Sequence, residues 1–184
     1  MEIITADEYL SIERQAEERN EFYMGECMVM AGGSRWHNRL AEQFFAALVH
    51  HLDGKSCTPY MADMRLSIEA HQHYVYPDVL VVCHEEAYIA DDMVNDATVI
   101  IEVLSPSTES YDRGRKFLHY QSLTSLREYV LITQDVMQAE VFRRGEKHKW
   151  EYERLNEPTD VVNLETLQFS ITLAELYKAI QFTQ

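Results

Sequence analysis

The sequence has no hydrophobic run long enough to cross a membrane. Its longest unbroken aliphatic run covers residues 79–83, whereas a membrane-spanning helix needs about 20 residues. Residues 1–8 lack the positive and apolar regions of a secretion signal. Glycine and proline are scarce, at 6 and 4 residues of 184, and 46% of the residues are hydrophobic, which excludes collagen-like and disordered chains. We expect one folded domain, residues 1–184, located in the cytoplasm.

Cysteine is also scarce. The three cysteines, Cys27, Cys57 and Cys83, are odd in number and far apart, and none belongs to a Cys-x-x-Cys motif. This spacing predicts neither a disulfide framework nor a cysteine-based metal or redox site. We therefore expect the thiols to be reduced, as is usual in the cytoplasm.

Positive charge is in deficit. The chain has 16 Lys and Arg residues against 31 Asp and Glu residues, a net charge of −15, which argues against a protein that coats nucleic acid. The excess of negative charge is concentrated in two segments, because residues 1–31 carry a net charge of −6 and residues 85–96 a net charge of −5. Residues 111–120 and 143–149 are instead basic, which leaves room for a local positive face. Its candidate members are Arg113, Arg115, Arg143, Arg144, Lys147 and Lys149.

The amino-terminal part predicts a helix, a hairpin and a second helix. Residues 5–8 form a capping box, which predicts a helix that runs to about Asn20. Residues 21–30 alternate in polarity around a central glycine, as a β-hairpin does. Residues 34–54 have apolar side chains at helical spacing between a capping serine and a terminal glycine.

The rest of the chain is rich in predicted strands. Residues 65–68 and 75–82 are extended, residues 84–96 are a polar surface loop or short helix, and residues 98–104 are apolar enough for a strand buried on both faces. A helix is predicted over about 110–122. Strands at 128–133, 139–144 and 150–155 and a capped helix at 172–180 complete the list. This order predicts an α/β or α+β fold with a mixed central sheet flanked by helices.

Two carboxylates lie in apolar strand sequences. Asp78 follows Pro77 at the start of an apolar run, and Glu102 lies in the middle of residues 99–104. Burying a carboxylate there is costly unless it is paired or binds a cation. Each residue alone is as easily explained by a strand end or an exposed edge. If the two strands are neighbours, the pair becomes a candidate site for Mg²⁺, which prefers one or two carboxylates plus water and phosphate oxygens.

The following helix adds a polar stripe. Asp112, Lys116 and Tyr120 are spaced i, i+4 and i+8, so they lie on one face. An exposed ion pair between the first two would contribute only a few tenths of a kcal/mol. The helix begins just after the Glu102 strand, however, so its first turns lie over the carboxyl end of that strand.

These motifs resemble the Uma2 family of endonucleases. The similar segments are Pro77-Asp78, the run Ile101–Thr108, the spacing Asp112-(x)3-Lys116-(x)3-Tyr120, a Glu-x-x-x-Gly hairpin within residues 20–26, and His37 at the start of the second helix. The resemblance spans most of the first 145 residues. The family, formerly a domain of unknown function, belongs to the PD-(D/E)xK nuclease superfamily.

The resemblance implies a restriction-endonuclease-like fold and a homodimeric endonuclease that hydrolyses DNA with Mg²⁺ or Mn²⁺. Asp78 and Glu102 would ligate the metal together with the Val103 carbonyl. Glu21, brought in from the hairpin, would complete the acidic cluster or hold a second ion. The chemical logic is that the metal polarises the phosphoryl oxygen and lowers the pKa of bound water.

The sequence departs from the superfamily pattern Glu-x-Lys, because Leu104 stands where the lysine is expected. In related branches the lysine has moved to the next helix, so the resemblance assigns its role to Lys116, which would orient or activate the attacking water. Asp112 and Tyr120 would position that lysine.

Other interpretations remain open. The negative charge and the missing lysine also suit a nuclease-fold binding or regulatory module with weak catalysis, and a metal-dependent hydrolase of small phosphates. Arg65 is a candidate substrate contact, like His37, although each is also explained as an ordinary exposed residue. The candidate DNA contacts are Arg113, Arg143 and Arg144.

Overall fold

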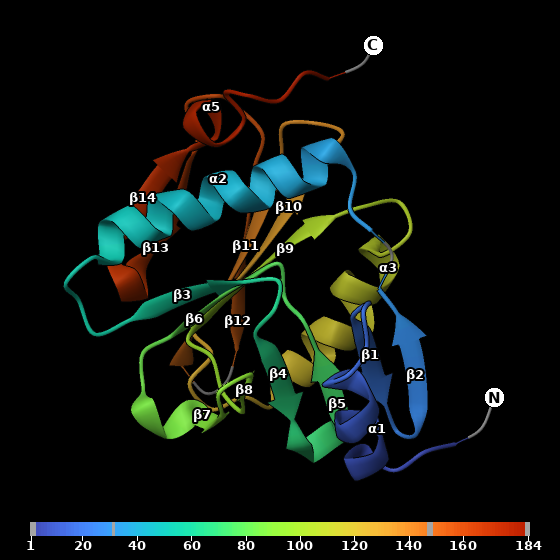
Figure 1. The fold of residues 1–184 in the computed structure, drawn as a ribbon. Coiled ribbons are helices and arrows are strands. Elements are labelled where there is room, and N and C mark those ends of the chain that lie inside the picture. Colours follow the sequence, from blue (N-terminus) through green and yellow to red (C-terminus); the bar gives the residue numbers. More distant parts are fainter. Residues whose placement is uncertain (1–2, 31, 147–148, 183–184) are drawn as a thin grey trace.

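The computed structural model describes residues 3–30, 32–146 and 149–182, and its fold is mixed α+β (Figure 1). One six-stranded sheet has the order β2-β1-β5-β4-β8-β7, a second has the order β12-β11-β10-β9-β6-β3, and β13 and β14 form a separate hairpin. We call the first the hairpin sheet and the second the central sheet. The β9–β10 and β4–β8 pairs are parallel, and the other pairs are antiparallel. The predicted fold class is confirmed.

The bounds of the strands are as follows. The hairpin sheet contains β1 (Asn20–Tyr23), β2 (Glu26–Val29), β4 (Arg65–Ile68), β5 (His73–Val75), β7 (Tyr88–Ala90) and β8 (Met93–Val94). The central sheet contains β3 (Thr58–Met61), β6 (Val79–Val82), β9 (Val99–Leu104), β10 (Glu128–Thr133), β11 (Ala139–Arg144) and β12 (Trp150–Leu155). The separate hairpin contains β13 (Val161–Leu164) and β14 (Phe169–Thr172).

The helices are fewer than the strands, and most of them are short. They are α1 (Ala6–Glu13), α2 (Arg35–Leu52), α3 (Glu109–Tyr111), α4 (Phe117–Tyr120) and α5 (Leu173–Leu176). A π-helical turn, η3 (Asp112–Lys116), joins α3 to α4, and η1 (Glu69–His71), η2 (Glu85–Ala87) and η5 (Glu165–Leu167) are 3₁₀ turns. None of the described helices is long and apolar enough to span a membrane.

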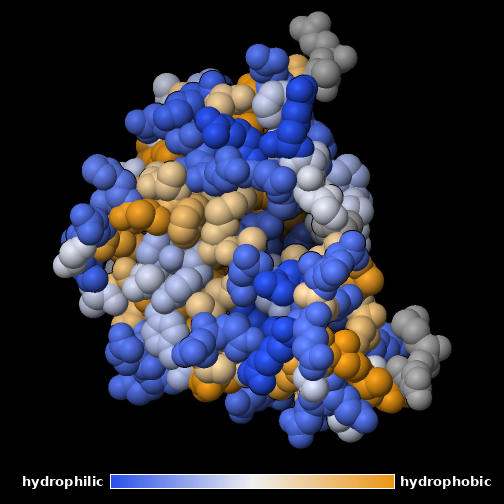
Figure 2. Space-filling view, in the orientation of Figure 1, coloured by the Kyte–Doolittle hydropathy of each residue, from blue (hydrophilic) through white to orange (hydrophobic). Residues whose placement is uncertain are grey.

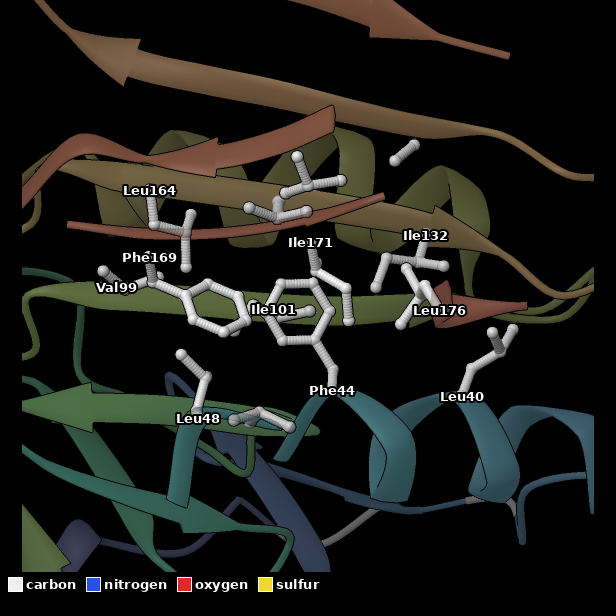
Figure 3. Close-up of a cluster of buried hydrophobic side chains, with 14 of the residues drawn as sticks. Leu40, Phe44, Leu48, Val99, Ile101, Ile132, Leu164, Phe169, Ile171 and Leu176 are labelled. Carbon is white, nitrogen blue, oxygen red and sulfur yellow. The ribbon is translucent and has the colours of Figure 1, made fainter. Parts of the chain in front are cut away.

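One face of the central sheet carries the main hydrophobic core. Leu40, Phe44 and Leu48 of α2 point toward this face, where they meet Val99 and Ile101 of β9 (Figure 3). The separate hairpin and α5 complete the same cluster with Leu164, Phe169, Ile171 and Leu176 (Figure 3). Each fully buried side chain of this size stabilises the fold by about 1.5–3 kcal/mol.

The other face of the central sheet determines where the site lies. Side chains alternate along a strand, so Val99, Ile101 and Val103 join the main core while Ile100 and Leu104 join a second cluster. That cluster includes Tyr120, Leu123 and Leu126 from and after α4. Glu102 shares the face of Ile100 and Leu104 and is therefore directed toward the α3–η3–α4 segment.

The predicted amino-terminal hairpin is confirmed. Met24 and Gly25, between β1 and β2, have φ angles of +47° and +95°, the left-handed values that a two-residue hairpin turn requires at both central positions. A Cβ atom on Gly25 would also lie 2.5 Å from Ile3 Cγ2. The glycine is therefore needed both for the turn and for the close approach of the amino-terminal segment.

The capping signals are confirmed, although two helices are shorter than predicted. Both capping boxes are formed, at Thr5 and at Thr172, and Gly54 ends α2 with a φ of +71°. The prediction that the first helix runs to about Asn20 is wrong, because α1 ends at Glu13. The Glu13 carboxylate accepts hydrogen bonds from the backbone and side-chain N–H groups of Asn20, both at 2.9 Å, and Asn20 begins β1. The last helix likewise ends before residue 180.

Two other predictions are corrected. The extended run 75–82 is split between β5 in the hairpin sheet and β6 in the central sheet, because Pro77 has no N–H for a strand ladder. The segment 84–96 contains β7 and β8 as well as a 3₁₀ turn, so it is not simply a loop or helix. Strands β13 and β14, which are short and paired only with each other, were not predicted from the sequence.

The expectation of reduced thiols is wrong for two of the three cysteines. Cys57 and Cys83 form a disulfide, with their Cα atoms 4.1 Å apart. The adjacent residues, Thr58 and Val82, are paired across β3 and β6, so strand pairing brings together two cysteines that are 26 residues apart. Cys27 is free and exposed.

Candidate active site

Strand pairing brings Asp78 and Glu102 together. Val79 of β6 is paired with Ile101 of β9, so the next positions along the two strands are Asp78 and Glu102. The backbone N–H of Asp78 lies 3.3 Å from Glu102 Oε2, and the backbone N–H of Val103 donates a 2.7 Å hydrogen bond to Asp78 Oδ2. The Glu102 side chain is only 3% exposed and that of Asp78 is 18% exposed, so the pair has one buried and one accessible carboxylate.

The helical segment supplies a buried lysine to this pair. Lys116 Nζ lies 3.2 Å from Glu102 Oε1, 3.0 Å from Glu21 Oε1 and 3.4 Å from Asp112 Oδ1. The Tyr120 hydroxyl donates a 2.8 Å hydrogen bond to the same Glu102 oxygen. We call Asp112, Lys116 and Tyr120 the lysine stripe. Its three members lie on one face of the helix, as their spacing predicted, and that face meets Glu102.

A backbone irregularity lies within the stripe. Residues 112–116 form a π-helical turn, which has one more residue per turn than the helix on either side of it. Such turns are rare and occur frequently at functional sites. The turn spans the interval between Asp112 and Lys116, so it sets how both side chains meet Glu102. Nothing in the sequence indicated it.

Negative charge is in excess around the lysine. Burial raises the pKa of Glu102 to about 8, Lys116 opposes this shift, and the nearby charges of Asp112 and Asp78 add to it. Burial alone would lower the pKa of Lys116, but Glu102 and Glu21 outweigh it and hold that pKa well above its usual value. Lys116 is therefore a cation in contact with three carboxylates, those of Glu21, Glu102 and Asp112. A site of this composition favours a further cation.

The cleft itself has a volume of about 420 Å³ and opens between the helical segment, β2 and α2. Its polar residues are Glu21, His37, Asp78, Glu102, Ser107, Thr108, Tyr111, Asp112 and Lys116. Met28, Val29 and Met30 form an apolar flank along β2. Hydrophilic residues cover most of the face seen in Figure 2, and hydrophobic ones are exposed beside the hairpin, where the Val29 side chain is 67% exposed.

His37 reaches the cleft from the first turn of α2. Its backbone N–H is bound by the capping residue Ser34 at 3.1 Å, and its Nε2 atom lies 3.3 Å from Asp78 Oδ2. Burial lowers the pKa of His37, but the hydrogen bond and charge of Asp78 outweigh burial and raise it. The predicted position of His37 at the site therefore agrees with the structure. Its Nε2 atom contacts Asp78, while its Nδ1 atom is buried without a hydrogen-bond partner among the described residues.

Glu21 of the hairpin contacts the buried lysine. Its Oε1 atom accepts from Lys116 and lies 3.4 Å from the backbone N–H of Tyr76. Among the residues that the structure describes, no group of three or more His, Cys, Asp or Glu side chains is arranged to hold a metal ion. Glu21 thus contacts the lysine that also contacts Glu102, and its role beside a metal stays a prediction.

The oxygens of Asp78 and Glu102 allow a metal site with two carboxylates. One oxygen of each is occupied, Asp78 Oδ2 by Val103 N–H and Glu102 Oε1 by Lys116 and Tyr120. Glu102 Oε2 has only the long 3.3 Å contact from the backbone of Asp78. Mg²⁺ prefers such hard oxygen donors, takes one or two carboxylates and fills its other positions with water and phosphate oxygens. The donor set therefore fits the ion.

Arg65 does not reach the cleft. It is 2% exposed, donates hydrogen bonds to the Tyr76 hydroxyl at 2.8 Å and to Asp92 at 3.2 Å, and Tyr76 in turn donates to Glu13 at 3.0 Å. This network links Tyr76, the residue before Pro77-Asp78, to Glu13 of α1. Its contacts are those of a structural residue rather than a substrate contact.

Replacing Arg65 with methionine should therefore lower the free energy of unfolding by about 1–3 kcal/mol, because the buried Tyr76 hydroxyl loses the donor Arg65 and Asp92 loses its ion pair with it. Urea unfolding followed by circular dichroism measures the change. The exposed substitution Arg39→Met is the control and should change it by no more than about 0.5 kcal/mol. A loss below about 1 kcal/mol for Arg65→Met would show that the network contributes little.

The three arginines predicted to contact DNA are bound elsewhere. Arg113 makes a bidentate pair with Glu140, at 2.6 and 2.8 Å, and Arg143 donates to Glu153 at 2.7 Å. Arg144 donates to the carbonyl oxygens of residues 121, 123 and 126. None lines the cleft. Lys147 lies outside the described residues.

Two cleft residues were missed by sequence reasoning. Tyr76 and Tyr111 both line the site. Tyr76 directly precedes Pro77-Asp78, so its adjacency to the motif could have indicated it. Tyr111 directly precedes Asp112, and only its position in the predicted helix could have indicated it.

Known proteins resemble this chain in sequence and in fold. The model of the Uma2 family, described as "putative restriction endonuclease", matches residues 6–174. Two uncharacterized proteins of Synechocystis sp. are similar: slr1290 is 29% identical over 97% of this chain and 94% of its own length, and sll1609 is 35% identical over 80% and 85%. A crystal structure described as a "putative nuclease belonging to DUF820", from Anabaena variabilis, has a TM-score of 0.79 at 18% identity and covers 95% of this chain and 98% of that one.

Proposed function

The chain belongs to the Uma2 family of restriction-endonuclease-like nucleases, and from its cleft we propose that it is a Mg²⁺- or Mn²⁺-dependent endonuclease that hydrolyses DNA phosphodiester bonds. The observation that carries the proposal is the position of Lys116, whose ammonium lies 3.2 Å from Glu102 although it comes from the next helix. Lys116 would take the role of the lysine that the motif expects at the position of Leu104. This supports the PD-(D/E)xK type with a displaced lysine.

In this proposal each residue of the cleft has a separate task. Asp78 and Glu102 would hold the metal, with the Val103 carbonyl as a further ligand. A bound Mg²⁺ would polarise the phosphoryl oxygen and lower the pKa of the attacking water. Lys116 would orient that water and offset the negative charge that develops on the phosphoryl oxygens, which is worth most in a partly buried site.

The remaining polar residues would hold the lysine and the substrate. Asp112 and Tyr120 fix Lys116 and Glu102 through the 3.4 and 2.8 Å contacts, which limits the motion of the ammonium group. His37 would contact a phosphate oxygen from the rim of α2. We also propose that the protein is a homodimer, as the family resemblance implies, and that it acts in the cytoplasm.

The negative charge of the chain bears on the substrate. Arg113 and Arg143 are paired with carboxylates, Arg144 donates to backbone carbonyl oxygens, and Lys116 is buried. DNA would therefore be held largely through the metal and the cleft, rather than by a broad basic surface, so non-specific affinity should be weak. A tenfold rise in salt concentration would lower the affinity for DNA by roughly 0.9 log unit for each phosphate that the protein contacts.

A panel of substrates tests the proposed substrate class. Supercoiled plasmid, linear duplex, single-stranded DNA and bis-p-nitrophenyl phosphate are each incubated with the protein and Mn²⁺. The proposal expects endonucleolytic cleavage of at least one DNA form, with little hydrolysis of the small diester. Hydrolysis of the small diester alone would favour the small-phosphate hydrolase, and DNA binding without cleavage would favour the binding module.

A further inference from the structure

A second hollow, apart from the cleft, is lined by two arginines. It is formed by residues 121–124 and Arg127, from the loop between α4 and β10, and by Arg144 and Gly145, at the end of β11. Its volume is about 370 Å³. We call it the arginine pocket. None of its lining residues lines the cleft of the candidate active site.

The arginine pocket lies toward the opposite end of the central sheet from the candidate active site. The backbone N–H of Arg127 donates a 2.9 Å hydrogen bond to the carbonyl of Thr98, directly before β9. Val103, which lines the cleft, comes five residues after Thr98. A strand rises about 3.3 Å per residue, so the two sites are separated by about 16 Å along β9.

The backbone holds the two arginines next to each other and fixes one guanidinium group. The backbone N–H of Arg144 donates to the Arg127 carbonyl at 2.8 Å. Arg144 Nε donates to the carbonyl of Leu126 at 2.7 Å, and Nη2 donates to the carbonyls of residues 121 and 123 at 2.9 and 3.0 Å. A guanidinium has five N–H donors. The two on Nη1 meet no acceptor in the described part of the chain and are therefore available to a ligand.

The two positive charges are not balanced by carboxylates. The acceptors of Arg144 are neutral carbonyls, and the exposed Arg127 side chain forms no ion pair with a described residue. Burial and the charge of Arg127 lower the pKa of Arg144, and Asp96 opposes this shift. Asp96 lines a neighbouring hollow, where its carboxylate accepts hydrogen bonds from the Thr124 hydroxyl and the Ser125 N–H, both at 3.1 Å. The arginine pocket itself is lined by no carboxylate among the described residues.

We propose that the arginine pocket binds a phosphate group, with Arg144 as the fixed donor and Arg127 as the exposed one. Arginine forks match the oxygens of phosphate, and two of them balance its two negative charges. Inorganic phosphate, the terminal phosphate of a DNA strand and a backbone phosphodiester all present this chemistry. The inference goes beyond the proposed nuclease function and does not depend on it, because the arginine pocket and the cleft share no residue.

Three variants test the site. Arg127→Gln removes the charge of an exposed side chain, so the fold should be retained. Arg39→Gln is the matched control, because it makes the same change of charge at an exposed position of α2. Lys116→Ala removes the cation of the cleft and thus separates binding in the arginine pocket from binding there. Arg144 is left unaltered, since its bonds to three carbonyls also hold the loop before β10.

Titration with inorganic phosphate in excess EDTA, followed by the backbone amide signals in NMR, measures the binding. A few charge-assisted hydrogen bonds predict a Kd of about 1 mM, and the signals of Thr124 and Gly145 should shift. Arg127→Gln should raise the Kd by at least about 10-fold, whereas Arg39→Gln and Lys116→Ala should change it by less than about twofold. No shift at these two residues, or the same Kd in Arg127→Gln as in Arg39→Gln, would overturn the proposal.

Two oligonucleotides of one sequence, with a 5′-phosphate or a 5′-hydroxyl, identify the source of the phosphate in the same titration. Tighter binding of the phosphorylated strand indicates a terminal phosphate, and equal binding that is lost in Arg127→Gln indicates the DNA backbone. Binding of inorganic phosphate alone indicates the free ion. EDTA prevents metal-dependent cleavage, so a protein that cleaves no DNA would fail the proposed function and still decide this inference. Failure of all three ligands to bind would overturn it and leave the proposed function standing.

Discussion

Replacing Lys116 with alanine should lower the rate of DNA cleavage by at least about 100-fold, the loss typical of removing one group that stabilises transition-state charge. The reason is that Lys116 is the only cation in direct contact with Glu21, Glu102 and Asp112 among the described residues. Lys116→Arg should restore little, because a planar guanidinium replaces a compact ammonium in a cluster of three carboxylates. Single-turnover cleavage under Mn²⁺ measures the effect.

The controls for this variant address metal binding and general damage. Lys178→Ala removes a lysine from an exposed position and should leave the cleavage rate unchanged. The rise in melting temperature caused by Mn²⁺ should persist in Lys116→Ala, because the lysine is not a ligand. Cleavage by Lys116→Ala within about threefold of the unaltered protein would show that Lys116 is not the displaced lysine of the superfamily motif.

The second large effect concerns the metal. An ion that binds only the folded protein at 100 times its Kd stabilises it by about 2.7 kcal/mol, which for a chain of this size raises the melting temperature by about 5–10 °C. Asp78→Asn and Glu102→Gln should abolish this rise under Mn²⁺ or Mg²⁺. Both variants preserve side-chain shape and an acceptor oxygen, so the bonds from Val103 N–H and the Tyr120 hydroxyl remain possible.

The metal-free variants should be at least as stable as the unaltered protein. Each substitution removes one negative charge from a buried cluster in which Asp78 and Asp112 already raise the pKa of Glu102. The exposed substitution Glu157→Gln is the control and should retain the full rise with metal. Differential scanning fluorimetry with and without EDTA measures all four proteins. A full Mn²⁺ response in both Asp78→Asn and Glu102→Gln would place the metal elsewhere.

Much of the local structure could be predicted because its signals are local. The capping boxes at Thr5 and Thr172 and the glycine turn at Gly25 depend on neighbouring residues, and they formed as expected. The alternation in residues 99–104 likewise indicated a buried strand. In the same way, the i, i+4, i+8 spacing of the lysine stripe was sufficient to place its three side chains on one helical face.

The features that were missed depend on tertiary contacts. The pairing of β3 with β6 aligns Cys57 with Cys83, and no local pattern reports such a register. The end of α1 at Glu13 depends on hydrogen bonds from Asn20, and the π turn at residues 112–116 depends on how the helix meets two sheets. The charges were misjudged for a similar reason, since Arg113 is paired with Glu140 from a distant strand.

Glu21 is the clearest example of a residue whose partner could not be predicted from the sequence. A carboxylate in a hairpin looks like a further metal ligand when only residue types are known. In the structure it lies 3.0 Å from a buried ammonium, which assigns it to the lysine. The chemistry of the Glu21 carboxylate could be predicted from its residue type, but its contact with Lys116 could be identified only from the fold.

The most direct test of the proposed nuclease is metal-dependent cleavage of supercoiled plasmid by the unaltered protein and Glu102→Ala, measured in parallel with Mn²⁺, with Mg²⁺ and with excess EDTA. The account predicts nicked or linear plasmid with the unaltered protein and metal, no product in EDTA, recovery of cleavage when metal is restored, and no product from Glu102→Ala under any condition. Cleavage that persists in EDTA, or equal cleavage by Glu102→Ala, would contradict it.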